Sequence, residues 1–143
     1  MNKILIINGA NLNLLGSREP HIYGDITLAK LEEMCLVKAK DFNYEIIFFQ
    51  SNSESEIINK IQENSAQGIT KLIINAGGFS HTSIAIMDCI IATNMKTVEV
   101  HISNINKRED FRHNSFIAKV ALGVICGLGI NGYLYAIEYL SKN

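Results

Sequence analysis

Short apolar runs alternate with amphipathic stretches along the whole of this chain. The runs are rich in β-branched residues and most are continuously apolar, which is typical of β-strands covered on both faces. They occupy residues 3–7, 45–49, 71–75, 97–101 and 122–126. The pattern therefore predicts five strands, each followed by a crossover segment.

The intervening stretches carry the helical period. Leu28, Leu31, Cys35 and Phe42 share one face of a first helix, and Ser53 with the glutamate three residues later forms a capping box for the second. Further helices are expected over residues 82–93 and 130–140. The order βαβαβαβαβα predicts a single α/β domain over residues 1–143, a flavodoxin-like, doubly wound, five-stranded parallel sheet of order 2-1-3-4-5.

Composition narrows the class of partner. The 143 residues are 48% hydrophobic and 19% charged, with a net charge of −1, so disorder is not expected and nucleic acid is disfavoured as the main partner. The first residues enter a strand directly, without a leader, which predicts a cytoplasmic protein. The uncharged stretch 120–137 is interrupted by four glycines and an asparagine, and we expect it to form strand, turn and helix rather than a membrane span.

Cys35, Cys89 and Cys126 are widely spaced and sit among apolar neighbours. A nucleophilic or redox thiol is one interpretation, and a set of buried thiols in a reducing compartment is the favoured one. Their spacing does not match a metal site.

The segment 9–24 is the most unusual connection in the chain. It takes sixteen residues where a strand-to-helix turn usually takes about 2–6. Long connections of this kind are commonly lids or binding loops. Arg18 and Tyr23 lie between Gly16 and Gly24, which predicts a hinged lid that carries chemistry.

Polar residues collect after three of the strands. Asn8, Asn11 and Asn13 follow the first, Asn75 to His81 the third, and His101 to Arg112 the fourth, including Ser103, Asn104 and Arg108. These strands are neighbours in the predicted order, and ligands in such sheets bind beyond the carboxyl ends of the strands. The sequence therefore predicts one site built from three loops.

Each of these residues also has a structural interpretation. Asn8 and Asn13 resemble ordinary turn residues, and His21 and His113 resemble surface residues. His81 and His101 could be either structural or functional. Two histidines could bind a metal, but without a carboxylate or thiol at ligand spacing we expect no metal site.

Asp88 lies on a helix that is apolar almost all round, with Ile84 and Ile91 on the same face. A helix that is apolar on every side is usually buried on every side, and an unpaired buried carboxylate is costly. We favour a contact with another subunit, and hence a homo-oligomer, over an Asp88 that points to solvent through a gap.

Four long motifs point to a known family. The segments NGANLNLLGSREPHIYG, INAGGFSHTS, VEVHISNI and REDFRHNSF, followed by GVICGLGINGYLYAI, closely resemble the type II 3-dehydroquinate dehydratases. The resemblance runs from end to end, in the same order and spacing. It implies loss of water from 3-dehydroquinate to give 3-dehydroshikimate, through an enolate and without a cofactor. This step belongs to the shikimate pathway, which supplies chorismate and the aromatic amino acids, and it also occurs in quinate breakdown.

The resemblance also implies roles for individual residues. Tyr23, as tyrosinate, would remove the proton next to the ketone, with Arg18 as its electrostatic partner. Asn11 would hold the water that steadies the enolate oxygen, and His101, backed by Glu99, would protonate the departing hydroxyl.

The remaining implied roles concern binding of the substrate. Asn75, Ser103 and the backbone N–H groups of Ile102 and Ser103 would hold the carboxylate, while His81 and Arg112 would bind the ring hydroxyls. Asp88 would reach the site of a neighbouring subunit in a homododecamer.

The base is the demanding part of this chemistry. An ordinary tyrosine pKa lies near 10, so titration near neutrality needs roughly 4 kcal/mol in favour of the anion. Desolvation under a closed lid acts against this, and an exposed ion pair contributes only about 0–1 kcal/mol. Arg18 must therefore act at short range in a water-poor site, with Arg112 as a second cation.

The chain departs from the family pattern at four loop positions. Ala10, Ala76 and Asp110 stand where proline is expected, and Gly78 where alanine is expected. These substitutions remove no proposed polar contact, and they predict looser loops by some tenths of a kcal/mol each.

Other functions on the same scaffold stay open at this point. A flavin carrier needs a hydroxyl-rich phosphate loop, and a phospho-acceptor receiver needs acidic residues where Asn8 and Asn75 stand. A different lyase or hydrolase could use Ser80 or Ser103 with a histidine, although the G-x-S-x-G motif is absent. A homologue that binds the ligand without turning it over is a further alternative.

Overall fold

The computed structural model, which describes residues 2–17 and 19–143, contains one five-stranded parallel sheet of order β2-β1-β3-β4-β5. The strands are β1 (Asn2–Asn8), β2 (Tyr44–Gln50), β3 (Lys71–Asn75), β4 (Lys96–His101) and β5 (Gly123–Cys126). The α-helices are α1 (Pro20–Tyr23), α2 (Leu28–Lys40), α3 (Glu54–Ala66), α4 (Ile84–Thr93) and α5 (Asn131–Lys142). The predicted fold class and strand order are confirmed, and every predicted strand ends within one residue of the observed one.

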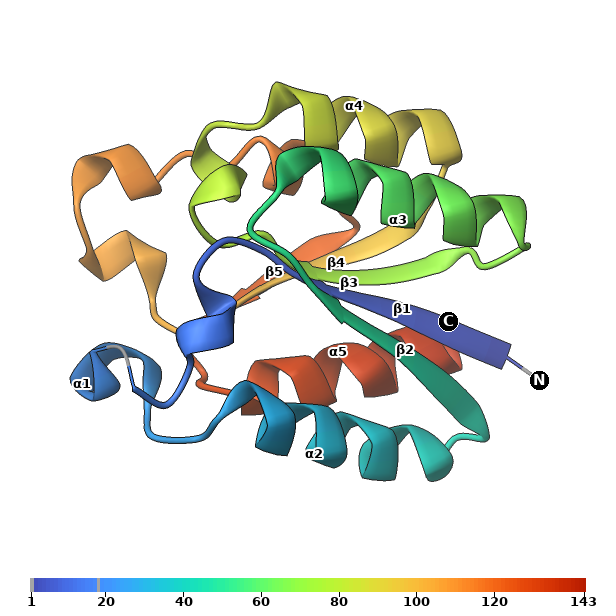
Figure 1. Cartoon of the computed structure of the whole chain (residues 1–143), viewed down its shortest axis with the longest axis horizontal. Helices are drawn as coiled ribbons and strands as arrows, with labels where there is room; N and C mark the ends of the chain where they lie inside the picture. Colours follow the sequence, from blue (N-terminus) through green and yellow to red (C-terminus); the bar gives the residue numbers. More distant parts are fainter. Residues whose placement is uncertain (1, 18) are drawn as a thin grey trace.

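The sheet lies between two helical layers (Figure 1). Ile4 and Ile6 of β1 pack on the side of α2 and α5, while Leu5 and Ile7 pack on the side of α3 and α4. Because successive side chains of a strand point to opposite faces, a continuously apolar strand supplies both cores. This explains why the inner strands show no alternation of apolar and polar residues.

Hydroxyl side chains cap the starts of α2, α3 and α4, from Thr27, Ser53 and Ser83. Ser53 accepts a hydrogen bond from the backbone N–H of Glu56, as the capping box predicts, but the Glu56 carboxylate accepts from Ser51 Oγ at 2.9 Å instead of closing the box. The helix predicted from residue 82 begins at Ile84, because Ser83 is its N-cap and accepts from the N–H of Ile86. His81 therefore ends a 3-10 turn and does not open the helix.

The crossover between β4 and β5 differs from the predicted alternation. Among the described residues it contains three 3-10 turns, Ile105–Lys107, Asp110–Arg112 and Ile117–Lys119, in place of an α-helix. The first turn is capped by the Asn104 side chain, which accepts from the N–H of Asn106. This segment lacks a continuous apolar stripe and carries polar residues at the end of the sheet. It therefore forms short turns held by local hydrogen bonds instead of an α-helix.

Two surfaces are less covered than the apolar pattern predicts. Ile84 and Ile91 of α4 are 53% and 57% exposed, and Asp88 on the same face is exposed as well. Leu122 and Val124, at the edge strand β5, are also exposed. Within one chain, Asp88 therefore faces solvent, and these faces of α4 and β5 are uncovered among the described residues. The subunit contact predicted for α4 stays a prediction.

The cysteines are free thiols, with Cys35 and Cys89 buried and Cys126 partly buried. Burial raises the pKa of Cys35 to about 12, so this thiol stays protonated and is a poor nucleophile. The stretch 120–137 divides into β5, a turn and the start of α5, as predicted. In the part of the chain that the structure describes, none of the helices combines the length and apolarity needed to cross a membrane.

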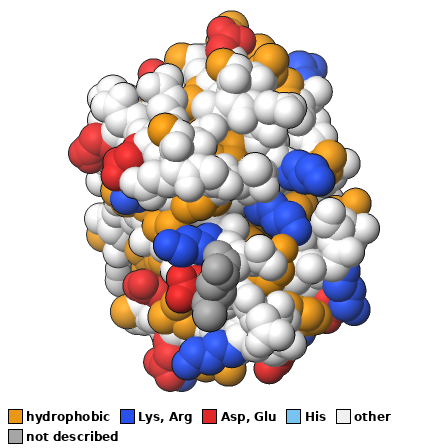
Figure 2. All heavy atoms as spheres, turned by 90° about the vertical axis from the view of Figure 1, so that its right-hand side faces the viewer, with side chains coloured by type: hydrophobic (Ala, Val, Ile, Leu, Met, Phe, Trp, Pro, Cys, Tyr) orange, Lys and Arg blue, Asp and Glu red, His pale blue; other side chains and the backbone are white. Residues whose placement is uncertain are grey.

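The face at the amino ends of the strands carries charges of both signs. Figure 2 shows this side, with Lys and Arg side chains interspersed with Asp and Glu and only small apolar areas between them.

Gly9 joins the carboxyl ends of β1 and β3 at very close range. Its N–H donates to the Asn75 carbonyl at 2.7 Å, and a Cβ added to Gly9 would lie 2.2 Å from the Ala76 carbonyl oxygen. Because the clash is with backbone, no side-chain movement relieves it. Only glycine lets the first and third loops meet here.

We expect Gly9→Ala to lower the free energy of unfolding by about 1–3 kcal/mol through this overpacking. Gly78→Ala serves as the matched control, because a Cβ at Gly78 meets nothing within 4 Å. It should raise the free energy of unfolding by about 0.4–1 kcal/mol by restricting the unfolded chain. Urea denaturation measures both, and a Gly9→Ala variant as stable as the parent would contradict the close approach.

Candidate active site

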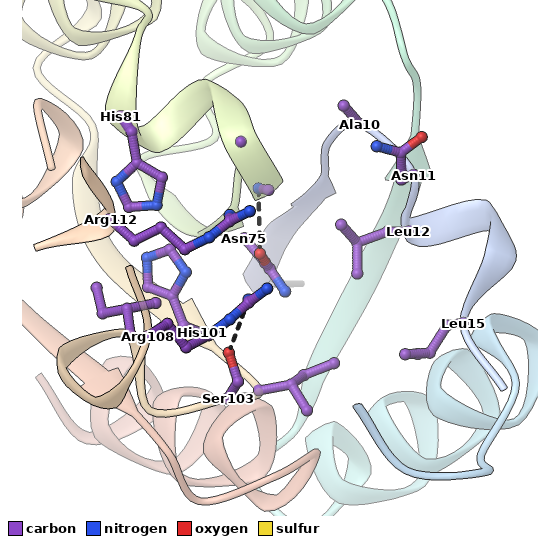
Figure 3. Close-up of a pocket in the computed structure, with 14 residues that line it drawn as sticks. Ala10, Asn11, Leu12, Leu15, Asn75, His81, His101, Ser103, Arg108 and Arg112 are labelled. Carbon is purple, nitrogen blue, oxygen red and sulfur yellow. Dashed lines mark hydrogen bonds between the residues drawn. The ribbon is translucent and has the colours of Figure 1, made fainter. Parts of the chain in front are cut away.

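A cavity of about 140 Å³ opens at the carboxyl ends of β1, β3 and β4. Its walls come from the loops after these three strands, so the prediction of one site built from three loops is confirmed (Figure 3). The lining residues are Ala10, Asn11, Leu12, Leu15, Asn75, Gly77, Gly78, His81, His101, Ile102, Ser103, Ile105, Arg108 and Arg112.

His101 and Glu99 form a hydrogen-bonded pair at the end of β4. Nε2 of His101 contacts Oε2 of Glu99, and the Glu99 side chain is fully buried. A buried carboxylate requires partners, and the imidazole is one of them. With Nε2–H donated to Glu99, Nδ1 is the ring nitrogen that can exchange a proton with a ligand in the cavity.

His81 stands beside His101 on the same wall. The two rings stack with their centroids 6.1 Å apart, and Nδ1 of His81 lies 2.9 Å from the Asn114 carbonyl oxygen. This contact fixes the imidazole of His81 at the rim. It fits a donor or acceptor for a ligand hydroxyl.

Two arginines give the cavity a positive wall. Figure 3 shows Arg108 and Arg112 extending toward Asn75, on the side of the cavity that holds both histidines. Arg112 Nε lies 3.0 Å from Glu109 Oε1, and Arg108 Nη1 donates to Ser103 Oγ at 3.3 Å. The pKa of Glu109 is lowered by hydrogen bonds from the Glu109 backbone N–H and from the Arg112 side chain. Glu109 therefore stays charged and holds Arg112 in place. The arrangement suits a small anionic ligand.

The Asn75 side chain is oriented by a buried network. Its Nδ2 donates to the Tyr133 hydroxyl at 2.9 Å, and its Oδ1 accepts from the N–H of Gly77 at 3.2 Å. Tyr133 in turn donates to Oδ1 of Asn8 at 2.7 Å. One hydrogen of Asn75 Nδ2 is thereby left for the cavity. The network also confirms the structural interpretation of Asn8.

The first half of the segment 9–24 is anchored. Leu12 and Leu15 are buried in the core on the side of α2 and α5, while the neighbouring Asn11, Asn13 and Leu14 are exposed. Gly16 and Gly24 adopt positive φ, 94° and 82°. The hinged lid stays a prediction.

The backbone of Asn11 is held in the left-handed region at φ 71° by the turn after β2. Its N–H donates to Oδ1 of Asn52 at 2.9 Å, and Gln50 Nε2 reaches both Asn52 Oδ1 and the Gly9 carbonyl, at 3.1 and 3.2 Å. This turn therefore supports the loop on one side of the cavity.

The structure brings together most of the residues predicted for the site. Seven of them line the cavity: Asn11, Asn75, His81, His101, Ile102, Ser103 and Arg112. Glu99 lies directly behind His101. Arg18 and the side chain of Tyr23 lie outside the described residues, although the Tyr23 backbone ends α1. Asp88 is on the exposed face of α4 and does not line this cavity.

Sequence reasoning missed several contributors. Arg108 was noted after the fourth strand but not assigned to the site, although charge and position both favoured it. Tyr133, Ser115 and Asn52 act from segments distant along the chain. Their side chains carried no signal in the sequence, because only the packed fold brings them to the site.

A serine nucleophile loses support. Ser80 is fully buried and does not line the cavity, and the Ser103 hydroxyl pairs with Arg108. These positions disfavour a serine nucleophile activated by histidine. Within residues 2–17 and 19–143, no cluster of three or more His, Cys, Asp or Glu side chains could hold a metal ion.

Comparisons with known proteins agree on one family. The family model described as dehydroquinase class II matches residues 2–141. A 3-dehydroquinate dehydratase of Buchnera aphidicola subsp. Baizongia pistaciae is 54% identical, and one of Actinobacillus pleuropneumoniae serotype 5b is 49% identical; each alignment covers 97% of this chain and 90% of the relative.

Solved structures give the same result. The type II dehydroquinase from Propionibacterium acnes superposes with a TM-score of 0.96 at 35% identity, covering 100% of this chain and 98% of the other. The type II dehydroquinase from Butyrivibrio crossotus has a TM-score of 0.95 at 44% identity, with coverage of 99% and 98%.

We expect Tyr133→Phe to lower the free energy of unfolding by about 1–3 kcal/mol, because it leaves the buried Asn8 oxygen and one Asn75 N–H without their partner. Tyr135→Phe on the same helix is the control, since Tyr135 is 53% exposed and should shift stability by less than about 0.5 kcal/mol. Chemical denaturation compares the two, and equal stabilities would contradict the network.

The pH dependence provides a second readout for Tyr133. Burial raises its pKa above the ordinary value near 10. Above that pH the unfolded phenol loses its proton while the buried one keeps it, so stability falls as the pH rises. Tyr133→Phe should show a smaller alkaline loss of stability than the parent chain.

Proposed function

Since this chain belongs to the class II dehydroquinase family, we propose that the cavity at the carboxyl ends of its strands is where 3-dehydroquinate loses water to give 3-dehydroshikimate. The chain is a type II 3-dehydroquinate dehydratase, a hydro-lyase of the shikimate pathway. The observation that supports this location best is the His101–Glu99 pair, which faces the same small cavity as two arginines and Asn75.

The reaction begins with removal of the proton next to the ketone, and Tyr23 is the proposed base. It acts as tyrosinate, with Arg18 beside it to stabilise the anion at short range. Both residues belong to the part of the 9–24 connection that lies between Gly16 and Gly24, two glycines with positive φ. Closure of this segment over the cavity would bring the base to the substrate and exclude water.

The resulting enolate needs a hydrogen-bond donor at its oxygen. Asn11 lines the cavity and is proposed to hold a water molecule for this purpose. Its backbone is fixed by Asn52, so the donor is in place before charge develops, which is the condition for effective electrostatic stabilisation.

His101 is the proposed acid for the departing hydroxyl. Glu99 accepts from Nε2, which leaves Nδ1 as the ring nitrogen proposed to deliver the proton. The base and the acid are different residues, so a deprotonated base and a protonated acid can be present at the same pH.

The other side chains position the substrate. Asn75, Ser103 and the N–H groups of Ile102 and Ser103 are proposed to hold the carboxylate, and His81 and Arg112 the ring hydroxyls. All of these residues line the cavity. The chemistry needs only side-chain acids and bases and bound water, so we propose that it proceeds without a cofactor.

Asp88 is proposed to act across a subunit boundary. It lies on an exposed apolar face of α4 with Ile84 and Ile91, a surface that a second chain would cover. In the proposed homododecamer, Asp88 reaches the site of a neighbouring copy. Free buried thiols suit a reducing compartment, which supports a cytoplasmic location.

The first experiment follows absorbance of the conjugated enone when the pure protein meets 3-dehydroquinate. We expect product formation by the parent chain and a loss in kcat of about 100- to 10,000-fold in Tyr23→Phe, which lacks the base. Tyr139→Phe, a half-exposed tyrosine on α5, controls for loss of a phenol and should keep its activity. No enone from the parent chain would reduce it to a binding homologue, and an active Tyr23→Phe would remove the base assignment.

A second experiment tests the partner of the base. We expect Arg18→Ala to lose most turnover while substrate binding changes less, because the guanidinium stabilises the tyrosinate rather than the bound substrate. Steady-state kinetics and calorimetric binding to a Tyr23→Phe background separate the two effects. Unchanged turnover in Arg18→Ala would refute its role.

A further inference from the structure

Ser115 contacts the acid pair from a segment that does not line the cavity. It precedes the 3-10 turn Ile117–Lys119 and is 7% exposed. Its Oγ lies 2.8 Å from Oε2 and 3.0 Å from Oε1 of Glu99. The Glu99 carboxylate thus has two hydrogen-bond partners, the buried Ser115 hydroxyl and the His101 imidazole.

The backbone of this turn fixes the direction of the Ser115 hydroxyl. The N–H of Ala118 donates to Ser115 Oγ at 3.2 Å, which occupies a lone pair of the oxygen. A hydroxyl has one proton to donate, and an ionised carboxylate can only accept. The proton of Ser115 must therefore point at Glu99.

The result is a chain of hydrogen bonds that runs from Ser115 through Glu99 to the His101 imidazole. Oε2 of Glu99 accepts from both Ser115 and His101. Glu99 lies within β4, so its backbone is held by the sheet, and the hydroxyl fixes the remaining rotation of the carboxylate plane. A fixed carboxylate plane in turn fixes the plane of the imidazole that donates to it.

We propose that Ser115 is a positioning residue for the dehydration: through Glu99 it orients His101 so that Nδ1 faces the departing hydroxyl. This inference rests on the proposed function, in which His101 is the acid. Ser115 does not touch the substrate, so its contribution belongs to proton delivery rather than to binding. Loss of the hydroxyl lets the carboxylate rotate and leaves His101 misaligned for part of the time.

The test compares Ser115→Ala with the parent chain. We expect kcat to fall about 10- to 100-fold, less than the 100- to 10,000-fold assigned to a complete acid, while KM changes less than about threefold. The pH profile of kcat should shift, because the His101–Glu99 pair that supplies the proton has lost the hydrogen bond from Ser115. Ser115→Cys keeps the volume with a weak donor and should give an intermediate kcat, and it replaces the alanine variant if that one does not fold.

Ser51→Ala is the matched control. Ser51 is 6% exposed, donates to the Glu56 carboxylate at 2.9 Å and accepts from the N–H of Ser53 at 2.9 Å, so it loses the same kinds of bond as Ser115. It does not line the cavity. We expect a similar loss of thermal stability with the parent pH profile. A Ser51→Ala variant with the same loss in kcat would assign the Ser115 effect to stability and overturn the inference.

His101→Asn separates this inference from the proposed function. If His101→Asn keeps the parent kcat, the acid assignment fails and nothing remains for Ser115 to position. If His101→Asn loses activity but Ser115→Ala keeps both kcat and pH profile, only the positioning role is overturned. Proton NMR gives a readout independent of turnover: the downfield resonance of the His101 ring N–H should move in Ser115→Ala and stay in Ser51→Ala.

Discussion

The constraint on which the site depends is the burial of the Glu99 carboxylate within strand β4. A fully buried charge is tolerated only where hydrogen-bond donors surround it. His101 comes from the same strand, and Ser115 comes from the crossover that follows. The need to satisfy this carboxylate therefore ties the irregular crossover to the end of β4, and the same contacts hold the imidazole of the proposed acid.

A second buried network performs the corresponding task for binding. Tyr133 links Asn8 at the end of β1 to Asn75 at the end of β3, and Gly9 lets the two loops approach within backbone contact. The carboxyl ends of β1 and β3 are thus tied together at the proposed binding site. Within the described residues of 16–24, the hydrogen bonds join near neighbours along the chain, such as the Gly24 N–H and the Pro20 carbonyl at 2.8 Å.

The departures from the family pattern fall in the loops after β1, β3 and β4. Ala76 has φ −75°, a value that proline would also adopt, and Asp110 is the first residue of a 3-10 turn, where proline is well tolerated. Neither substitution changes the backbone path that these positions require. The loops around the cavity rely on glycine contacts and side-chain hydrogen bonds for the order that proline would otherwise supply.

The sequence by itself determined the sheet, its strand order, the two helical layers and the three loops that form the cavity, because apolar period and turn chemistry act over short distances along the chain. It did not show that the apolar faces of α4 and β5 are exposed within one chain, since an apolar residue does not reveal whether its cover lies in the same chain. Only the tertiary structure joined Tyr133 to Asn75, Asn52 to Asn11 and Ser115 to Glu99. Each is a single polar contact between segments distant in sequence, and such contacts follow from packing rather than from any local pattern.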